Sequence, residues 1–210
     1  MVEAIFFDLD GVLVDACDWH YHSLNEALQE VVGYDISRER HENEFNGLPT
    51  RVKLEMLGIE GDTATRVWEL KQQKTLEVIA KYAKIQEEKI ELFEYLQSKN
   101  VKICCVTNSI QKTTKQMLTS TGQISYFDHI ITNEDVEKNK PYPDCYNLAV
   151  ERTGLNPNNC MIVEDSAKGM LSARSSVVPN TNIFQVSDTS GVTLKSIKEF
   201  VNENFDTDGW

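Results

Sequence analysis

The sequence predicts an α/β protein in which a helical domain is inserted into a doubly wound, Rossmann-like parallel sheet. Five short apolar segments alternate with helical stretches along the chain, and this alternation is typical of parallel crossover units. One long segment breaks the pattern, because residues 15–83 contain no strand-like run. We therefore expect a sheet-containing core formed by residues 1–14 and 84–210, and a helical cap domain formed by residues 15–83.

The predicted strands are short and apolar, as strands buried on both faces of a parallel sheet are. They cover residues 4–7, 101–106, 129–132, 160–163 and 183–186. The predicted helices follow from apolar residues at helical spacing and from the residues at their ends. Those of the insert cover residues 19–32, 51–57 and 63–82. Those of the core cover residues 89–98, 111–121, 144–153 and 194–203.

The composition argues against several classes of partner and location. The 210 residues include 33 acidic and 21 basic side chains, for a net charge of −12, and no lysine- or arginine-rich run. Nucleic acids and anionic membrane surfaces are therefore not expected partners. The five cysteines include no CxxC pair, which favours a reducing compartment. Because no segment resembles a signal peptide or a membrane span, we expect a cytoplasmic protein.

Two carboxylates follow the first predicted strand, one residue apart. Successive side chains of a strand point to opposite faces, so Asp8 and Asp10 can converge only if the chain leaves the strand between them. Gly11 permits such a tight exit. One aspartate could then attack an electrophile while the other handles a proton, and the pair also suits a hard cation. Taken alone, this motif is slightly more typical of an Asx turn at a strand end.

Polar motifs also close three further predicted strands. Thr107 and Asn108 follow the second strand, either as donors to phosphate oxygens or as a helix cap. Lys140 follows the third strand in a proline-flanked loop, which alone would be a solvated turn. Glu164 and Asp165 close the fourth strand, as a metal site or as a cap of the next helix. Because ligands bind beyond the carboxyl ends of parallel strands, we expect these groups to form one site with the two aspartates.

Four motifs in this order resemble those of the haloacid-dehalogenase superfamily: Asp8-Leu9-Asp10, Thr107, Lys140 and Glu164-Asp165. The insert resembles the helical cap of the phosphatase and β-phosphoglucomutase branch. The resemblance implies that Asp8 is a nucleophile that becomes an aspartyl-phosphate. It implies that Asp10 protonates the leaving oxygen and then activates water, and that Thr107 and Lys140 hold the transferring phosphoryl group, with Asn108 beside the substrate.

The same resemblance implies a Mg²⁺ site. Its ligands would be the side chains of Asp8 and Asp165 and the backbone carbonyl of Asp10, with Glu164 in support. Mg²⁺ and the Lys140 ammonium would cancel the repulsion between an attacking carboxylate and an anionic phosphoryl group.

Substrate choice is expected to lie with the cap. His20 resembles a histidine found early in the cap of β-phosphoglucomutases, although it could simply pack at the hinge. Gly47, Thr50 and Arg51 belong to a loop that resembles the specificity loop of that branch. Thr50 stands where the mutases carry a phosphate-binding arginine, and Arg51 is displaced by one position. Lys74 shares a helical stripe with apolar residues, which is consistent either with a lysine that faces the core domain and binds substrate or with one laid along that surface with its head in water.

The leading hypothesis is a Mg²⁺-dependent phosphatase that acts on a small phosphorylated metabolite, such as a sugar phosphate. The second hypothesis is a hexose-phosphate mutase that uses the same aspartyl-phosphate. A non-catalytic phosphate-binding regulatory protein is the third, and the presence of Asp8, Asp10 and Lys140 argues against it. We expect a monomer, with neither nucleic acid nor membrane as a partner.

Overall fold

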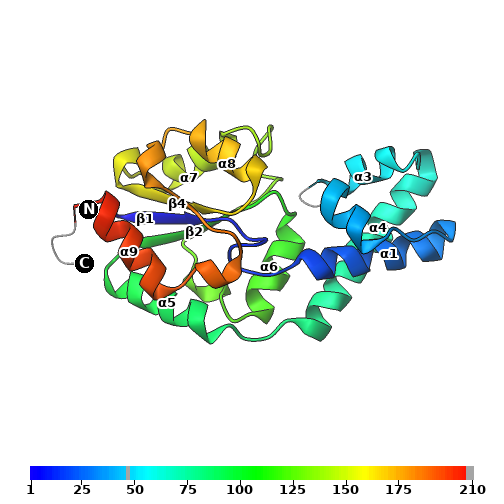
Figure 1. Cartoon of the computed structure of the whole chain (residues 1–210), viewed down its shortest axis with the longest axis horizontal. Coiled ribbons are helices and arrows are strands. Elements are labelled where there is room, and N and C mark those ends of the chain that lie inside the picture. Colours follow the sequence, from blue (N-terminus) through cyan, green and yellow to red (C-terminus); the bar gives the residue numbers. More distant parts are fainter. Residues whose placement is uncertain (46–47, 207–210) are drawn as a thin grey trace. The chain divides into compact units, whose positions relative to one another are not determined.

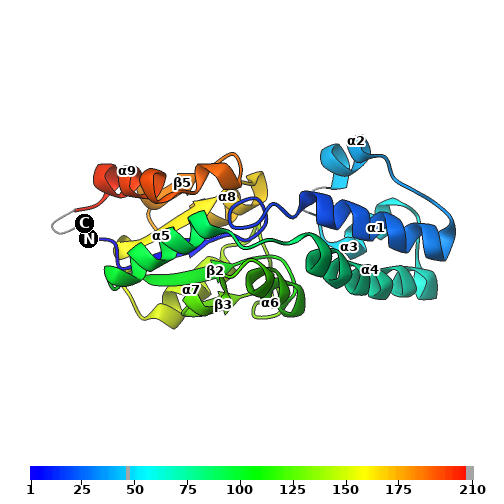
Figure 2. The same ribbon diagram turned by 90° about the horizontal axis from the view of Figure 1, so that it is seen from below.

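The structure, a computed structural model, describes residues 1–45 and 48–206 and confirms the predicted α/β fold (Figures 1 and 2). Five parallel strands form one sheet in the order β3-β2-β1-β4-β5. They are β1 (Ala4–Phe7), β2 (Lys102–Val106), β3 (His129–Ile131), β4 (Cys160–Glu164) and β5 (Ile183–Gln185). In the part of the chain that the structure describes, no helix combines the length and apolar character needed to cross a membrane.

The chain divides into two compact units. The sheet unit consists of Met1–Asp15 and Lys84–Trp210, and the helical unit consists of Ala16–Ala83. In the sheet unit, α7 (Asp144–Thr153) and α8 (Ala167–Arg174) cover one face of the sheet (Figure 1). The other face is covered by α5 (Glu87–Ser98), α6 (Gln111–Ser120) and α9 (Leu194–Asn204). Short 3₁₀ helices lie at η2 (Ile124–Tyr126), η3 (Pro157–Asn159), η4 (Asn180–Asn182) and η5 (Thr189–Gly191).

The central strand β1 sets the register of the sheet. Phe7, its last residue, lies opposite Cys105 of β2 and Val163 of β4. Because the three strands run parallel, they end at the same edge of the sheet, and the residues that follow them are brought together there. All four residues of β1 are fully buried, as expected for a strand with helices on both faces.

The helical unit packs around its own apolar core. Its elements are α1 (Cys17–Val32), α2 (Arg38–Arg40), the π-helix η1 (His41–Phe45), α3 (Thr50–Met56) and α4 (Gly61–Tyr82). Leu24 and Leu28 of α1 meet Leu54 of α3 and Val67 of α4, each at most 1% exposed. The spacing of the two leucines is that of one helix face, which is why α1 packs along α4.

The sequence analysis set no bounds for α2, η1 and α8, although it considered a helix after Asp165. They are short, and a few residues carry too little periodicity to identify a helix. Two of them begin at a serine cap, since Ser37 accepts a hydrogen bond from the backbone N–H of Arg40 and Ser166 from that of Gly169. The other predicted elements are present, with ends that differ by at most two residues, as helix ends commonly do.

His41 is a buried titratable group in the helical unit. Only 1% of the residue is exposed, and neither ring nitrogen has a hydrogen-bond partner. Its ring packs edge-to-face on Tyr21, with 5.4 Å between the centroids. Burial, and next the positive charge of Lys53, lower the pKa of His41 to about 4. The folded protein therefore favours the neutral imidazole.

We expect acid to destabilise the protein through His41. The folded-state pKa is lowered from 6.5, so this contribution to stability is complete above pH 6.5 and is lost as the pH falls toward 4. Relative to a His41→Phe variant, the free energy of unfolding of the wild type should fall by about 2 kcal/mol between pH 7.5 and pH 5. Urea denaturation at both pH values measures the difference. An equal fall in the two proteins would show that His41 does not titrate in this way.

Candidate active site

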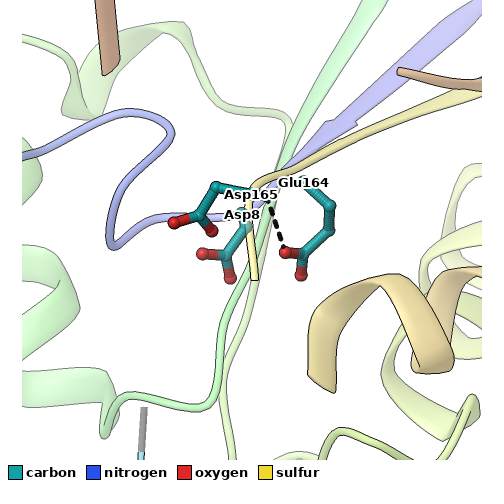
Figure 3. A group of neighbouring side chains, drawn as sticks. All are labelled: Asp8, Glu164 and Asp165. Atoms are coloured by element: carbon teal, nitrogen blue, oxygen red, sulfur yellow. Dashed lines mark hydrogen bonds between the residues drawn. The ribbon is translucent and has the colours of Figure 1, made fainter. Parts of the chain in front are cut away.

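Three carboxylates meet where β1 and β4 end (Figure 3). Asp8 follows β1, Glu164 is the last residue of β4 and Asp165 comes next. Each offers an oxygen that lies within 4.8 Å of those of the other two. The dashed line in Figure 3 marks the bond that the Asp165 backbone N–H donates to Glu164 Oε2, at 3.0 Å. Two strands that are distant in the sequence thus build one acidic cluster.

The chain turns sharply after the first aspartate. Backbone N–H groups of Leu13 and Val14 both donate to the carbonyl of Leu9, at 2.9 Å. Gly11 has φ of +88°, a conformation that a residue with a side chain rarely adopts. A Cβ atom at this position would also lie 2.0 Å from Asp165 Oδ2. Glycine therefore permits both the turn and the close approach of Asp165.

Lys140 reaches the acidic cluster from the loop after β3. Its Nζ lies 2.6 Å from Asp8 Oδ1 and 2.6 Å from Glu164 Oε1, with its side chain 4% exposed. It also donates to the carbonyl of Val106 at 2.8 Å and to the hydroxyl of Tyr146 at 3.0 Å. Burial alone would lower the pKa of Lys140, but Asp8 and then Glu164 raise it well above its ordinary value. The ammonium therefore stays charged beside Asp8.

Asn108 holds the backbone of Lys140. Its side-chain nitrogen donates to the Lys140 carbonyl at 3.1 Å, and its side-chain oxygen accepts from the Lys140 N–H at 3.0 Å. Both ends of the Asn108 amide are thus engaged with the protein. The amide positions the loop that carries Lys140, and the substrate contact expected of Asn108 stays a prediction.

The end of β2 presents two hydroxyl groups. Thr107 is buried, and its oxygen accepts a hydrogen bond from the backbone N–H of Ser109 at 3.0 Å, which leaves its own O–H as a donor. Ser109 in turn donates from Oγ to Asp10 Oδ2 at 2.9 Å. The sequence analysis did not single out Ser109. Its place two residues after Thr107 at a strand end was the available signal.

Glu164 is saturated by protein donors. Its Oε1 accepts from Lys140 Nζ and from the Tyr146 hydroxyl, the latter at 2.8 Å. Its Oε2 accepts from the N–H of Asp165 at 3.0 Å and from the N–H and Oγ of Ser166, both at 3.3 Å. The residue is fully buried. A carboxylate with these partners is suited to holding Lys140 in place, and it has little remaining capacity for a metal ion.

Asp8 and Asp165 fit a cation better. Asp165 Oδ1 is buried without a hydrogen-bond partner, and burial, followed by the charge of Glu164, raises the pKa of Asp165 to about 6. Burial also raises the pKa of Asp8 well above its ordinary value, although Lys140 opposes the shift. A divalent cation would give the Asp165 oxygen a partner and keep both groups ionised. Oxygen ligands of this kind suit Mg²⁺.

The helical unit contains two buried lysines that the sequence analysis did not single out. Lys53 and Lys71 are 5% and 7% exposed. Lys71 Nζ lies 3.4 Å from Nδ1 of His20. The signal for Lys71 was its spacing, because it lies four residues from both Val67 and Thr75, which are buried on the same face of α4.

Two cations that were predicted to bind substrate lie elsewhere in the helical unit. Lys74 Nζ is 3.5 Å from a carboxylate oxygen of Glu30 and 3.8 Å from one of Glu26, both exposed residues of α1. Arg51 is exposed and places its guanidinium over the ring of Trp68, 5.3 Å from the centroid. The apolar residues Leu70 and Val78 had indicated Lys74, whereas the buried lysine of α4 is Lys71, which lies about one turn before it.

The remaining predicted cap residues belong to one loop. Gly47 lies outside the residues that the structure describes. Thr50 is half-buried and is the first residue of α3, after Pro49. The roles predicted for these residues stay predictions.

Comparison with known proteins identifies a family, two similar proteins and a similar solved structure. A model of the family described as haloacid dehalogenase-like hydrolase matches residues 5–183. The chain is 28% identical over 182 residues to the phosphorylated carbohydrates phosphatase of Thermotoga maritima, covering 83% of this chain and 81% of that protein. It is 25% identical over 219 residues to the β-phosphoglucomutase of Bacillus subtilis, covering 94% and 95% of the two chains. The structure matches a crystal structure of β-phosphoglucomutase from Clostridium difficile, with a TM-score of 0.77, 26% identity and coverage of 97% and 98%.

Proposed function

The chain belongs to the haloacid dehalogenase-like hydrolase family and is a phosphoric monoester hydrolase by class, and we propose that it hydrolyses a small phosphorylated metabolite through an aspartyl-phosphate on Asp8. The observation that carries this proposal is the buried contact of 2.6 Å between Asp8 Oδ1 and Lys140 Nζ. Asp165 Oδ1, which is buried without a hydrogen-bond partner, belongs to the same cluster. The phosphatase from Thermotoga maritima supports a sugar phosphate as the substrate class.

The first proposed step is attack by a carboxylate oxygen of Asp8 on phosphorus. The bond from phosphorus to the leaving oxygen breaks, and that oxygen keeps the electron pair and takes a proton from Asp10. Lys140 and the hydroxyl of Thr107 stabilise the charge on the transferring oxygens. Ser109 holds Asp10 from Oγ, which fixes the acid in this step.

The second proposed step regenerates the enzyme. Asp10, now ionised, accepts a proton from water, and the resulting hydroxide forms a bond to phosphorus. The bond from phosphorus to the Asp8 oxygen breaks, which releases inorganic phosphate and restores the carboxylate. The buried ammonium of Lys140, 2.6 Å from Asp8 Oδ1, stabilises that returning charge.

Asp8, Asp165 and the backbone carbonyl of Asp10 are the proposed ligands of Mg²⁺, with Glu164 in support. When bound, Mg²⁺ would neutralise charge on the phosphoryl group and the carboxylates. Glu164 is not a direct ligand in this proposal, because its two oxygens already accept hydrogen bonds from Lys140, Tyr146 and the backbone after β4. It supports the site by holding these groups in place.

We further propose that the helical unit serves as a cap that selects the leaving group. Its insertion directly after the strand that carries Asp8 supports this role. His20, Lys53 and Lys71 are the residues we assign to substrate recognition, because the two lysines place buried positive charge in this unit and Lys71 Nζ lies 3.4 Å from Nδ1 of the half-buried His20. Arg51 and Lys74 are less suited to that task, since the exposed Arg51 lies over the ring of Trp68 and the half-buried Lys74 is paired with Glu30.

A mutase is the second candidate, and the likeness to two β-phosphoglucomutases favours it. A mutase must also grip the phosphate that is not reacting, and a cation in the cap would do so. Thr50 does not supply that cation where the resemblance places an arginine, whereas Lys53 and Lys71 offer positive charge at other positions. The two activities differ in whether water or a second sugar hydroxyl takes the phosphoryl group from Asp8.

We expect phosphate release to exceed isomerisation for every hexose phosphate tested. A panel of phosphorylated metabolites that includes β-glucose 1-phosphate should be assayed both for inorganic phosphate and for product isomers, with Mg²⁺ present. The Asp8→Asn variant, run in parallel, shows which release belongs to this site. The mutase would be the correct assignment if β-glucose 1-phosphate were converted to glucose 6-phosphate faster than phosphate is released, and if the corresponding sugar bisphosphate stimulated that conversion.

A further inference from the structure

The phenol of Tyr146 lies within the charged network around Lys140. Tyr146 is fully buried on α7, and Lys140 Nζ lies 4.7 Å from the centroid of its ring. Its hydroxyl accepts a hydrogen bond from Lys140 Nζ at 3.0 Å and donates one to Glu164 Oε1 at 2.8 Å. One hydroxyl therefore contacts both partners of the buried ion pair.

Lys140 has more acceptors than it can fully satisfy. An ammonium carries three N–H groups, whereas oxygens of Asp8, Val106, Tyr146 and Glu164 all lie within hydrogen-bond distance of Nζ. The two carboxylates compete for the same charge, and both contacts are 2.6 Å long. A group that weakens the attraction between Glu164 and Lys140 Nζ therefore strengthens the ion pair between Lys140 and Asp8.

The Tyr146 hydroxyl has that effect. Its hydrogen bond to Glu164 Oε1 partly satisfies a fully buried carboxylate, which otherwise would draw more strongly on Lys140. The buried ring also limits where the ammonium can move. The effect of the phenol is to hold the Lys140 charge at Asp8.

We propose that Tyr146 is a positioning residue, which acts through Glu164 to keep the Lys140 ammonium on Asp8 and on the phosphoryl group that Asp8 receives. The inference rests on the proposed function of this site. It assigns to α7 an influence on the rate of phosphoryl transfer, exerted through Glu164 and Lys140, in addition to its packing against the sheet.

The test removes the hydroxyl and keeps the ring. We expect Tyr146→Phe to lower kcat about tenfold, the effect of losing one hydrogen bond to a charged group, while KM changes less than about twofold. Tyr142→Phe is the matched control, because Tyr142 lies in the same loop as Lys140 but is 54% exposed. The control should keep the kcat of the wild type. A purely structural Tyr146 would lower the urea midpoint of Tyr146→Phe and leave kcat unchanged.

A second readout follows Lys140 without turnover. In protein labelled with ¹⁵N-lysine, the buried ammonium should give a slowly exchanging signal, identified by its absence in Lys140→Met. We expect this signal to shift in Tyr146→Phe and to stay in place in Tyr142→Phe. An unshifted signal, or an unchanged kcat in the folded variant of an active enzyme, would overturn the role of Tyr146 alone. A wild type without turnover on any phosphate ester would overturn the proposed function itself, and this role with it.

Discussion

Replacement of Asp8 by asparagine is expected to reduce turnover by at least about 10⁴-fold on every phosphorylated substrate. An amide of the same shape cannot attack phosphorus, so neither the intermediate nor its hydrolysis can follow. The fold should remain, because Lys140 keeps its contact with Glu164 and its bond to the carbonyl of Val106. The measurement is kcat on the best metabolite of the panel, together with the circular dichroism spectrum of the variant.

The control for this variant is Asp206→Asn, which makes the same chemical change at an exposed aspartate of the sheet unit. It should retain the activity of the wild type. Near-normal turnover in Asp8→Asn would show that the phosphoryl group is not transferred to this residue.

Removal of divalent cations should also lower turnover strongly. We expect excess EDTA to lower turnover by at least about a hundredfold, and Mg²⁺ to restore it, since burial raises the pKa of both Asp8 and Asp165 and the buried Asp165 Oδ1 has no hydrogen-bond partner. Zn²⁺ should restore less, because this site offers oxygen ligands only. Full activity in excess EDTA would contradict the proposal.

Asp165→Asn sharpens this experiment. The substitution leaves Asp8 and Lys140 in place and removes one proposed ligand charge, so the Mg²⁺ concentration needed for half-maximal activity should rise at least about tenfold. A variant with an unchanged requirement for Mg²⁺ would show that Asp165 does not bind the metal.

The sequence was sufficient to predict the acidic cluster because the end of each strand can be located from the sequence alone. Asp8, Lys140 and Glu164 each follow or end a predicted strand, and parallel strands bring such residues to one edge. This prediction required that the strands run parallel, but it did not require the order of the strands in the sheet. The hydrogen bonds of Asn108 and Tyr146 could not be predicted in this way, because the order of the strands brings residues to one edge but does not determine which polar groups pair there.

The helical unit was harder to predict because a helix face is defined by its partner. Lys71 and Lys74 are one turn apart on α4, and apolar residues flank both of them. Only the packing of α1 against α4 decides that Lys71 is buried and that Lys74 meets Glu30. A stripe drawn from Leu70 to Val78 therefore pointed to Lys74 and missed the more buried Lys71, and the substrate contact expected of Lys74 stays a prediction.

The position of β1 in the sheet has a consequence during synthesis on the ribosome. This strand emerges first, yet it lies between β2 and β4, and β4 is made much later. Until residue 164 has left the exit tunnel, β1 can pair with β2 but not with β4, and the carboxylate that fixes Lys140 is not yet in place. A nascent chain, or a fragment released before β4, therefore carries the nucleophile without the groups that activate it, and the chain acquires its reactivity only when almost the whole sheet can assemble.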